Sequence, residues 1–279
     1  MVTGGVGFVG TNLVKRLLRE GHNVFSIDNY LTGKKENKQE GCTYIDADIN
    51  NLGHISKLFS DIDVIFHMAA LARIQPSLKN PQETIYTNVN GTLSILSLAK
   101  ENNIPVIYAG SSSFHHGLYA SAYAWSKHAG EQLCKLYSEI HGLSTSICRF
   151  YNVYGPHQLE DGEYSTVLGI FEKQYRNNEP LTVTGNGEQR RDFTYIDDIV
   201  DGLYRCMGKE FKAEIFELGR GINYSINEIV DMFGAERKYI PARNGEYDKT
   251  LCDYTNAAGL LGWEPKVDLQ DYINRIKKI

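Results

Sequence analysis

Short apolar runs and longer amphipathic runs alternate along the first 152 residues. Short blocks of β-branched and aliphatic residues are typical of strands that are buried on both faces of a sheet. The longer runs between them have the apolar spacing of helices, and such alternation predicts right-handed βαβ units around a parallel sheet. We expect strands at residues 23–27, 42–46, 63–68, 105–109 and 144–150.

Four helices are expected in the same part of the chain, at residues 10–20, 53–59, 89–102 and 123–141. In the last two, apolar residues recur at helical spacing: Leu93, Leu96 and Ala99, then Leu133, Tyr137 and Ile140. Each of these faces could pack against the sheet or meet a second subunit. Beyond Gly155 the loops are longer and more polar, with helices expected at residues 165–177, 197–207, 226–233 and 270–278.

A glycine-rich segment, Thr3-Gly4-Gly5-Val6-Gly7-Phe8-Val9-Gly10, leads into the first expected helix. Glycines here allow a tight turn and let the backbone approach a pyrophosphate, to which the helix N-terminus offers free N–H groups. Asp28 follows the next strand at about the 20-residue spacing of a carboxylate that binds the adenosine ribose. Because a carboxylate there repels a 2′-phosphate, the pattern predicts NAD rather than NADP.

The motif and the alternation together predict an α/β fold, a Rossmann-type doubly wound parallel sheet with a smaller α/β substrate-binding lobe. We assign residues 1–152 to the NAD-binding domain, with residues 192–213 returning to it. Residues 153–191 and 214–279 form the expected lobe. Only Met1 and Val2 precede the motif, so either the central strand is short or the chain has lost residues at its start.

A tyrosine and a lysine lie four residues apart in the segment Tyr123-Ala124-Trp125-Ser126-Lys127, so a helix would project both from one face. An ammonium beside a phenol favours the phenolate, and a bound nicotinamide cation adds to this effect. Tyr123 could then act as a general base toward a substrate hydroxyl. Ser111, Ser112 and Ser113 follow the strand at 105–109, at the edge where parallel sheets bind ligands.

Composition excludes several other classes of function. The chain has 279 residues and a net charge of −5, without long Lys/Arg runs, so nucleic-acid binding is not expected. No apolar run approaches the roughly 20 residues of a membrane span, and no secretory signal is visible, so we expect a cytoplasmic protein. The five cysteines are widely spaced and predict free thiols. No metal site is predicted, His115-His116 included, because adjacent side chains diverge.

These motifs, in this order, resemble those of the extended short-chain dehydrogenase/reductase family of NAD-dependent epimerases and dehydratases, and specifically its UDP-hexose 4-epimerase branch. Besides residues 3–10 and 123–127, the matching segments are Asp28-Asn29-Tyr30-Leu31-Thr32-Gly33, Asp48-Ile49, Phe66-His67-Met68-Ala69-Ala70, Asn88-Val89-Asn90-Gly91-Thr92, Arg149-Phe150-Tyr151-Asn152-Val153-Tyr154-Gly155-Pro156, residues 185–198, Arg243-Asn244-Gly245-Glu246 and Leu261-Gly262-Trp263-Glu264-Pro265. They cover nearly the whole chain.

The resemblance implies NAD contacts along the glycine-rich loop and at the ends of the following strands. They are Gly4, Gly7, Phe8, Val9, Gly10, Asp28, Asn29, Tyr30, Leu31, Thr32, Gly33, Asp48, Ile49, Met68, Ala69, Ala70, Asn88, Tyr123, Lys127 and Tyr151. It also implies that Ser112 is the catalytic hydroxyl beside Tyr123 and Lys127, with Ser113 as the second choice.

The implied substrate is a nucleotide sugar, with Ser112 and Ser113 near the sugar and Asn152, Arg191 and Arg243 on the diphosphate. Two arginines suit a diphosphate because charge-assisted bidentate bonds hold it strongly. Thr250 aligns with a residue that sets the size of the sugar pocket. A small side chain there leaves room for a 2-N-acetyl group, so UDP-GlcNAc/GalNAc is a candidate substrate as well as UDP-Glc/Gal.

The choice of reaction depends on the residues after the catalytic hydroxyl. In related 4,6-dehydratases an Asp-Glu pair follows it and works at C5 and C6, whereas this chain has Ser113 and Phe114. A phenyl ring exchanges no proton, so we expect a 4-epimerase that works through a 4-keto intermediate. The alternatives are another oxidoreductase or dehydratase of the family, or a non-catalytic NAD-binding protein, which would have no use for Ser112, Tyr123 and Lys127 together.

Two further expectations come from the resemblance. The loop between Gly117 and Tyr123 is much shorter than in most relatives, and His115-His116 replaces an apolar-Tyr pair, which would open the active site or alter substrate choice. A homodimer through the helices at 89–102 and 123–141 is implied as well.

Overall fold

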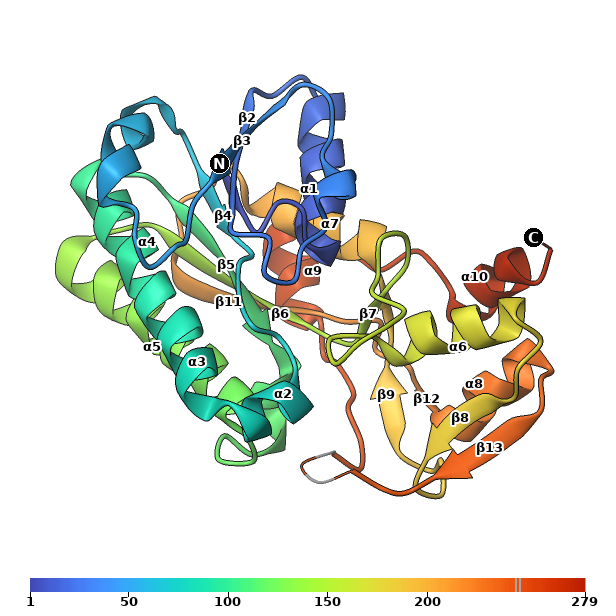
Figure 1. Ribbon diagram of the computed structural model, residues 1–279. Coiled ribbons are helices and arrows are strands. Elements are labelled where there is room, and N and C mark those ends of the chain that lie inside the picture. The colour runs from blue at the N-terminus through green and yellow to red at the C-terminus, as the bar shows by residue number, and fades with distance from the viewer. Residues whose placement is uncertain (244, 246, 279) are drawn as a thin grey trace.

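A seven-stranded parallel sheet forms the centre of the molecule, in the order β11-β6-β5-β4-β1-β2-β3 (Figure 1). The computed structural model describes residues 1–243, 245 and 247–278. The strands of the sheet are β1 (Val2–Thr3), β2 (Val24–Asp28), β3 (Cys42–Asp46), β4 (Ile65–His67), β5 (Val106–Ser111), β6 (Thr145–Phe150) and β11 (Lys212–Leu218). The chain runs outward from β1 to β3 and then returns to β4 on the other side of β1. The predicted fold class is thereby confirmed, with a ligand-binding switch point between β1 and β4.

The central strand β1 has only two residues, yet it pairs with both neighbours. Val2 and Thr3 are fully buried between Ser26–Ile27 of β2 and Phe66–His67 of β4. The backbone nitrogen of Met1 donates to the Val64 carbonyl oxygen at 2.7 Å. This bond extends the pairing of β1 to the residue just before β4. The glycine-rich loop therefore leaves the sheet directly at its switch point.

Helices cover both faces of the sheet (Figure 1). Helices α1 (Phe8–Arg19) and α7 (Ile196–Cys206) pack together on one face, and α4 (Gly91–Glu101) and α5 (Ala122–His141) pack together on the other. Helix α9 (Thr255–Leu261) lies beside α7. The shorter turns of this domain are η1 (Lys35–Asn37), η2 (Gly53–Asp61), α2 (Ile74–Lys79), α3 (Pro81–Ile85), the π-helical η3 (Tyr86–Asn90) and η4 (Ser112–His116).

Helix α5, which carries Tyr123, has clear signals at both ends. The Ser121 side chain accepts the Ala124 backbone N–H at 3.1 Å, as an N-cap residue does. Gly142 ends the helix with a φ of +67°, a left-handed conformation that favours glycine. The N-cap fixes where the helix begins. It therefore also fixes the direction of Tyr123, which lies in the first turn.

The smaller lobe is built from the later part of the chain. Its elements are β7 (Val153–Tyr154), α6 (Val167–Arg176), β8 (Leu181–Thr184), β9 (Arg190–Asp192), β10 (Thr194–Tyr195), β12 (Asn223–Ser225), α8 (Ile226–Phe233), β13 (Arg237–Ile240) and α10 (Leu269–Ile276). They form two-stranded sheets that pair β7 with β10, β9 with β12, and β8 with β13. Because β11 lies in the main sheet, the segment that returns to the first domain extends to Leu218, beyond the expected boundary at 213.

Asp192 ties several segments of the lobe together. Its buried carboxylate accepts backbone N–H groups from Arg220 and Gly221, both at 2.8 Å, and from Cys252 at 3.0 Å. Three such bonds replace the water that a buried carboxylate loses. The residue therefore fixes the loop after β11 against the segment that carries Thr250.

All five cysteines are free, as predicted. Among the described residues, no helix combines the length and the apolar character needed to cross a membrane.

Candidate active site

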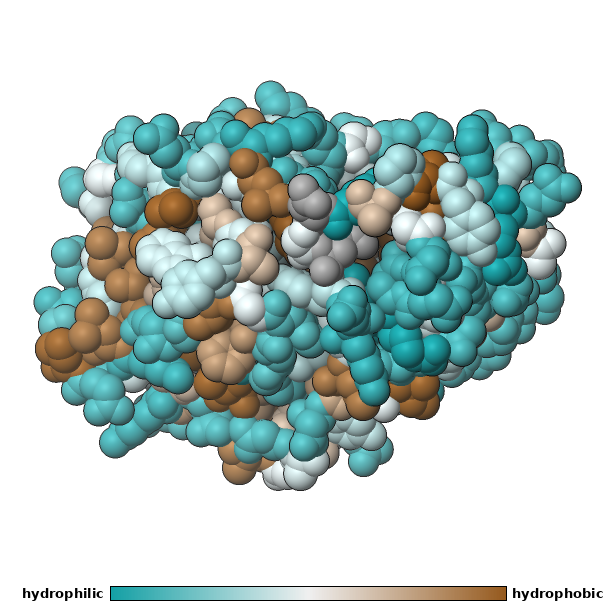
Figure 2. Space-filling view, turned by 90° about the horizontal axis from the view of Figure 1, so that it is seen from below, coloured by the Kyte–Doolittle hydropathy of each residue, from teal (hydrophilic) through white to brown (hydrophobic). Residues whose placement is uncertain are grey.

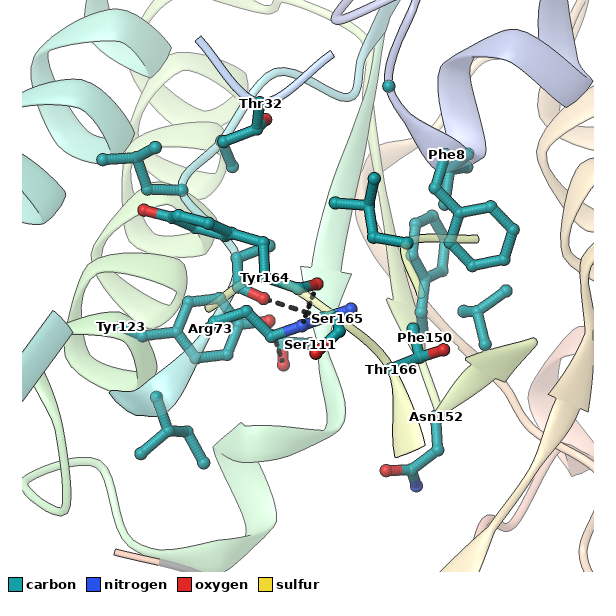
Figure 3. Close-up of a pocket in the computed structure, with 18 of the residues that line it drawn as sticks. Phe8, Thr32, Arg73, Ser111, Tyr123, Phe150, Asn152, Tyr164, Ser165 and Thr166 are labelled. Atoms are coloured by element: carbon teal, nitrogen blue, oxygen red, sulfur yellow. Dashed lines mark hydrogen bonds between the residues drawn. The ribbon is translucent and has the colours of Figure 1, made fainter. Parts of the chain in front are cut away.

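A cavity of about 740 Å³ lies at the carboxyl ends of the central strands, between the main domain and the lobe. Figure 3 shows Phe8 and Phe150 on one side of it, and Thr32, Arg73 and Tyr123 on the other. Most residues predicted from the sequence line this cavity: Gly4, Gly7, Phe8, Val9, Gly10, Asp28, Asn29, Leu31, Thr32, Gly33, Ile49, Met68, Ala69, Ala70, Ser112, Ser113, Tyr123, Asn152, Arg191, Arg243 and Thr250.

The glycine-rich loop forms a cradle that side chains would fill. Gly4 has a φ of +72°, and a β-carbon on Gly10 would lie 2.0 Å from the Gly4 carbonyl oxygen. Glycine is therefore required at both positions by the backbone itself. The first-turn N–H groups of α1 have no partners within the helix and lie at the cavity, as pyrophosphate binding requires.

The carboxylate of Asp28 stands at the end of β2 on the cavity wall. Its two oxygens accept the backbone N–H groups of Val6 at 3.1 Å and Tyr30 at 2.8 Å. Burial raises the pKa of Asp28, and these two bonds act against that effect. The carboxylate is held next to the glycine-rich loop, which is the position that a ribose of NAD requires.

Tyr123 and Ser111 form the central polar contact of the cavity. The Tyr123 hydroxyl donates to the Ser111 Oγ at 3.1 Å, and Ser111 also accepts the Ser113 backbone N–H at 3.2 Å. Ser112, which the resemblance implies as the catalytic hydroxyl, lines the cavity beside this pair without that contact. Strand β5 continues through Ser111, and η4 begins at Ser112, so the strand carries the first serine of the three toward the phenol.

Arg73 is a site residue that the sequence reasoning missed. It follows β4, lines the cavity, and lies beside Tyr123 and Ser111 (Figure 3). Burial raises the pKa of Tyr123, whereas the Ser111 hydrogen bond and the positive charge of Arg73 lower it. The only signal in the sequence was a single charge in the apolar run after the third predicted strand.

Lys127 lies one helical turn from Tyr123, behind the cavity wall. It is buried, and its Nζ is 4.4 Å from the centre of the Tyr108 ring. Burial lowers the pKa of Lys127 to about 8. The helical spacing places the two residues in successive turns of α5, with Tyr123 in the cavity lining and Lys127 outside it.

Other predicted cofactor residues also stand behind the wall and support it: Tyr30, Asp48, Asn88 and Tyr151. The Asn88 side chain holds the backbone of Leu71, accepting its N–H at 2.8 Å and donating to its carbonyl at 3.1 Å. Asp48 accepts the Asn29 side-chain N–H at 2.9 Å. In the structure these two residues position the loops that line the cavity.

The lobe side of the cavity is organised around Asn152 and Thr250. Asn152 donates to the Asp192 carbonyl oxygen at 2.7 Å and to the Thr250 Oγ1 at 3.2 Å. Thr250 is buried and accepts the Asp192 backbone N–H at 2.9 Å. Arg191 and Arg243 line the same side. Asn244 and Glu246, from the motif that begins at Arg243, lie outside the described residues.

The space beside the shortened loop is taken by residues from the lobe. The Tyr247 ring lies 4.8 Å from the His116 ring between their centres, and a β-carbon on Gly245 would lie 3.5 Å from the Ala120 carbonyl oxygen. Within the described part of the chain, the buried Tyr247 hydroxyl has no hydrogen-bond partner. The lobe therefore reaches the cavity wall close to Tyr123, a feature that the sequence reasoning did not foresee.

Comparison with known proteins agrees with this geometry. The model of the NAD dependent epimerase/dehydratase family matches residues 1–219. The chain belongs to this family. A UDP-glucuronate 4-epimerase of Thermodesulfobacterium geofontis is 32% identical to this chain, and the alignment covers 99% of this chain and 94% of that epimerase.

Solved structures extend the likeness to the whole fold. The UDP-glucose 4-epimerase of Thermotoga maritima, solved with UDP-glucose, has a TM-score of 0.93 at 29% identity, covering 99% of this chain and 96% of its own. A UDP-N-acetylglucosamine 4-epimerase of Methanobrevibacter ruminantium, solved with UDP-N-acetylmuramic acid, has a TM-score of 0.92 at 28% identity, covering 99% and 96%.

The family assignment settles the cofactor. Enzymes of this family are NAD-dependent and act on sugar nucleotides as epimerases, dehydratases or decarboxylases. The glycine cradle and Asp28 fit NAD in this structure, so the prediction of NAD is confirmed.

Proposed function

We propose that this family member is an NAD-dependent 4-epimerase of a nucleotide-diphosphate sugar, with UDP-Glc/Gal and UDP-GlcNAc/GalNAc as the first candidates. The observation that carries the proposal is the contact between Tyr123 and Ser111. This pair lies in one cavity with the glycine cradle and with the lobe residues Arg191 and Arg243. A sugar held between these two halves would present its ring carbons to the phenol.

Tyr123 would exchange the proton of the sugar O4. NAD, when bound, supplies the hydride acceptor and a positive charge on its ring. Because burial raises the phenol pKa in the free protein, Tyr123 is neutral there, and cationic groups around it favour the phenolate. Ser111 would orient O4 toward the phenol, and the same phenol would return the proton once the 4-keto sugar has turned over.

The lobe residues would hold the nucleotide diphosphate and set the space for the sugar. Arg191 and Arg243 come from separate segments of the lobe and could each form charge-assisted bonds to phosphate oxygens. Asn152 is fixed by two hydrogen bonds and could add a neutral donor. The small side chain of Thr250 supports the acceptance of a 2-N-acetyl group.

The surroundings of Phe114 argue against dehydration. Its ring lies 3.6 Å from the guanidinium carbon of Arg149, which is paired with Glu131 at 2.6 Å and Glu217 at 2.9 Å. Counted from Ser112, the pair that is Asp-Glu in related dehydratases is Ser113-Phe114, and the Phe114 ring lies in a packed cluster. Counted from Ser111, the pair is Ser112-Ser113, so neither register supplies a carboxylic acid for work at C5 and C6.

The outer face of α4 and α5 supports a homodimer. Leu93, Leu136 and Ile140 are 40%, 47% and 66% exposed, whereas Leu96 and Ala99 are fully buried against the sheet. Figure 2 shows apolar side chains gathered at the end of the molecule that carries these helices, on the left as in Figure 1. A second copy would cover them, as the resemblance implies.

The test is a product analysis without added cofactor. Purified protein is incubated with UDP-galactose and with UDP-N-acetylgalactosamine, and the nucleotide sugars are then separated. The proposal expects conversion to the 4-epimer without net NADH. A 4-keto-6-deoxy product would instead indicate a dehydratase, net NADH would indicate another oxidoreductase, and retained NAD without turnover of any sugar nucleotide would indicate a non-catalytic protein.

A further inference from the structure

The guanidinium of Arg73 lies at the reacting end of the cavity, and none of the described residues gives it a carboxylate partner. Arg73 donates from Nε to the Tyr164 carbonyl oxygen and from Nη1 to the Ala72 carbonyl oxygen, both at 2.9 Å. These bonds fix the plane of the group but use only part of its five N–H donors. Figure 3 shows it next to the Tyr123–Ser111 pair.

Arg149 provides an internal comparison. It is buried, and Glu131 and Glu217 neutralise it through direct ion pairs. Across residues 1–243, 245 and 247–278, no carboxylate pairs with Arg73, and burial lowers its pKa. Arg73 is half-buried at the wall of the cavity, and a ligand that fills the cavity would displace water from its guanidinium. An anionic ligand would then supply the missing counter-charge, whereas a neutral one would not.

The position of Arg73 indicates which part of a ligand it would meet. Arg191 and Arg243 reach the cavity from the lobe, where the proposed function puts the diphosphate, whereas Arg73 comes from the loop after β4. Tyr123, beside Arg73, would act at O4 of the sugar. A group at Arg73 is therefore a substituent on a carbon next to C4, either C3 or the C5 that carries C6.

We propose that Arg73 selects sugar nucleotides that carry a carboxylate beside the reacting carbon, with a hexuronate, whose C6 is a carboxylate, as the first candidate. This inference rests on the proposed function for the placement of C4 at Tyr123, and it puts a hexuronate ahead of the neutral hexoses named there. A carboxylate matches the planar fork of a guanidinium and accepts charge-assisted bonds from it. The hydroxymethyl group of a neutral hexose would leave the cation without a counter-charge.

Equilibrium binding tests this without turnover. The Tyr123→Phe holoenzyme with NAD is titrated by calorimetry with UDP-glucuronate and UDP-glucose, and we expect UDP-glucuronate to bind about tenfold more tightly or better. Adding Arg73→Gln should remove this preference and leave the affinity for UDP-glucose within about twofold, since only the charge-assisted bonds are lost. Arg73→Lys, which keeps the charge but not the fork, should retain part of the preference.

Arg176→Gln is the matched control, because Arg176 is an exposed arginine at the end of α6 that pairs with Glu160 and lies outside the cavity lining. It should keep the full preference. A second comparison, UDP-N-acetylmuramate against UDP-N-acetylglucosamine, distinguishes a carboxylate on the C3 side from one at C6, and a preference in either pair supports the role of Arg73. The inference is overturned if neither carboxylate sugar is preferred, or if the preference survives Arg73→Gln. Because only binding is measured, the role of Arg73 can be decided even if the protein does not catalyse epimerisation.

Discussion

The Tyr123 hydroxyl donates a hydrogen bond to the Ser111 Oγ across 3.1 Å, from the first turn of α5 to the last residue of β5. Both ends of this bond are fixed by regular secondary structure, and the N-cap at Ser121 fixes the start of the helix. A reacting oxygen that meets both hydroxyls therefore has a defined place in the cavity. Rigid positioning of this kind is what proton transfer to a substrate requires.

The serine that assists Tyr123 can be identified by a matched pair of variants. We expect Ser111→Ala to lower kcat by about 100-fold, because a positioned hydrogen-bond donor to the reacting oxygen is lost. Ser112→Ala should have a much smaller effect, since Ser112 does not contact the phenol. Steady-state kinetics of both variants, with NAD content as a check on folding, decides the point. The reverse order of effects would support Ser112, as implied by the family resemblance.

Asp28 should control the choice of cofactor. We expect Asp28→Ala to weaken NAD binding by about tenfold or more, because the ribose hydroxyls lose their hydrogen-bond acceptor. The preference for NAD over NADP should also become smaller, because no carboxylate then repels the 2′-phosphate of NADP. Asp46, paired with Asp28 in the sheet register but exposed, provides the control variant Asp46→Ala. Fluorescence titration of both cofactors measures the effect. An unchanged preference in Asp28→Ala would contradict the assignment.

Glu172 on α6 should make the lobe sensitive to pH. Burial raises its pKa to about 7, while the Tyr272 and Gln158 hydrogen bonds act against this. The folded protein therefore holds the proton more tightly than the unfolded chain, so the stability from this group is full below about pH 4.5 and is lost as the pH rises through about 7.

Glu172→Gln should consequently raise the free energy of unfolding at about pH 8 by roughly 3 kcal/mol and change it little at about pH 4.5. The amide oxygen can still accept from Tyr272 and Gln158. Denaturant unfolding at both pH values measures the difference, with Glu36→Gln, on the exposed surface of η1, as the control. An equal effect at both pH values would show that the ionisation of Glu172 is not responsible.

Much of the main domain could be predicted because its signals are local. The strand at Cys42–Asp46 and the helix at Ile226–Phe233 have the predicted bounds, since apolar spacing and caps determine them. The predicted helix at 53–59 is instead the 3-10 turn η2 (Gly53–Asp61), and β11 (Lys212–Leu218) lies in the main sheet although residues from 214 onward were assigned to the lobe. The pairing of β11 with β6 depends on contacts between segments that are far apart in the sequence, so it cannot be predicted from a short segment.

The candidate site divides in the same way. The cradle at Gly4 and Gly10 could be predicted because the backbone itself requires glycine there. The contact of Ser111 could not, because three consecutive serines give no register until the end of β5 is known. Arg73 and Tyr247 enter the cavity from loops that only the packing of the two domains brings together.

The central claim is that Tyr123 exchanges the O4 proton while hydride leaves C4 and returns to it. The most direct test follows a nucleotide sugar deuterated at C4 through the reaction in wild-type protein and in Tyr123→Phe, both loaded with NAD. The account predicts that the wild type forms the 4-epimer with deuterium retained at C4, and that Tyr123→Phe binds NAD normally but is slower by at least about 100-fold. Wild-type turnover in Tyr123→Phe, or an epimer that has lost its deuterium to solvent, would contradict it.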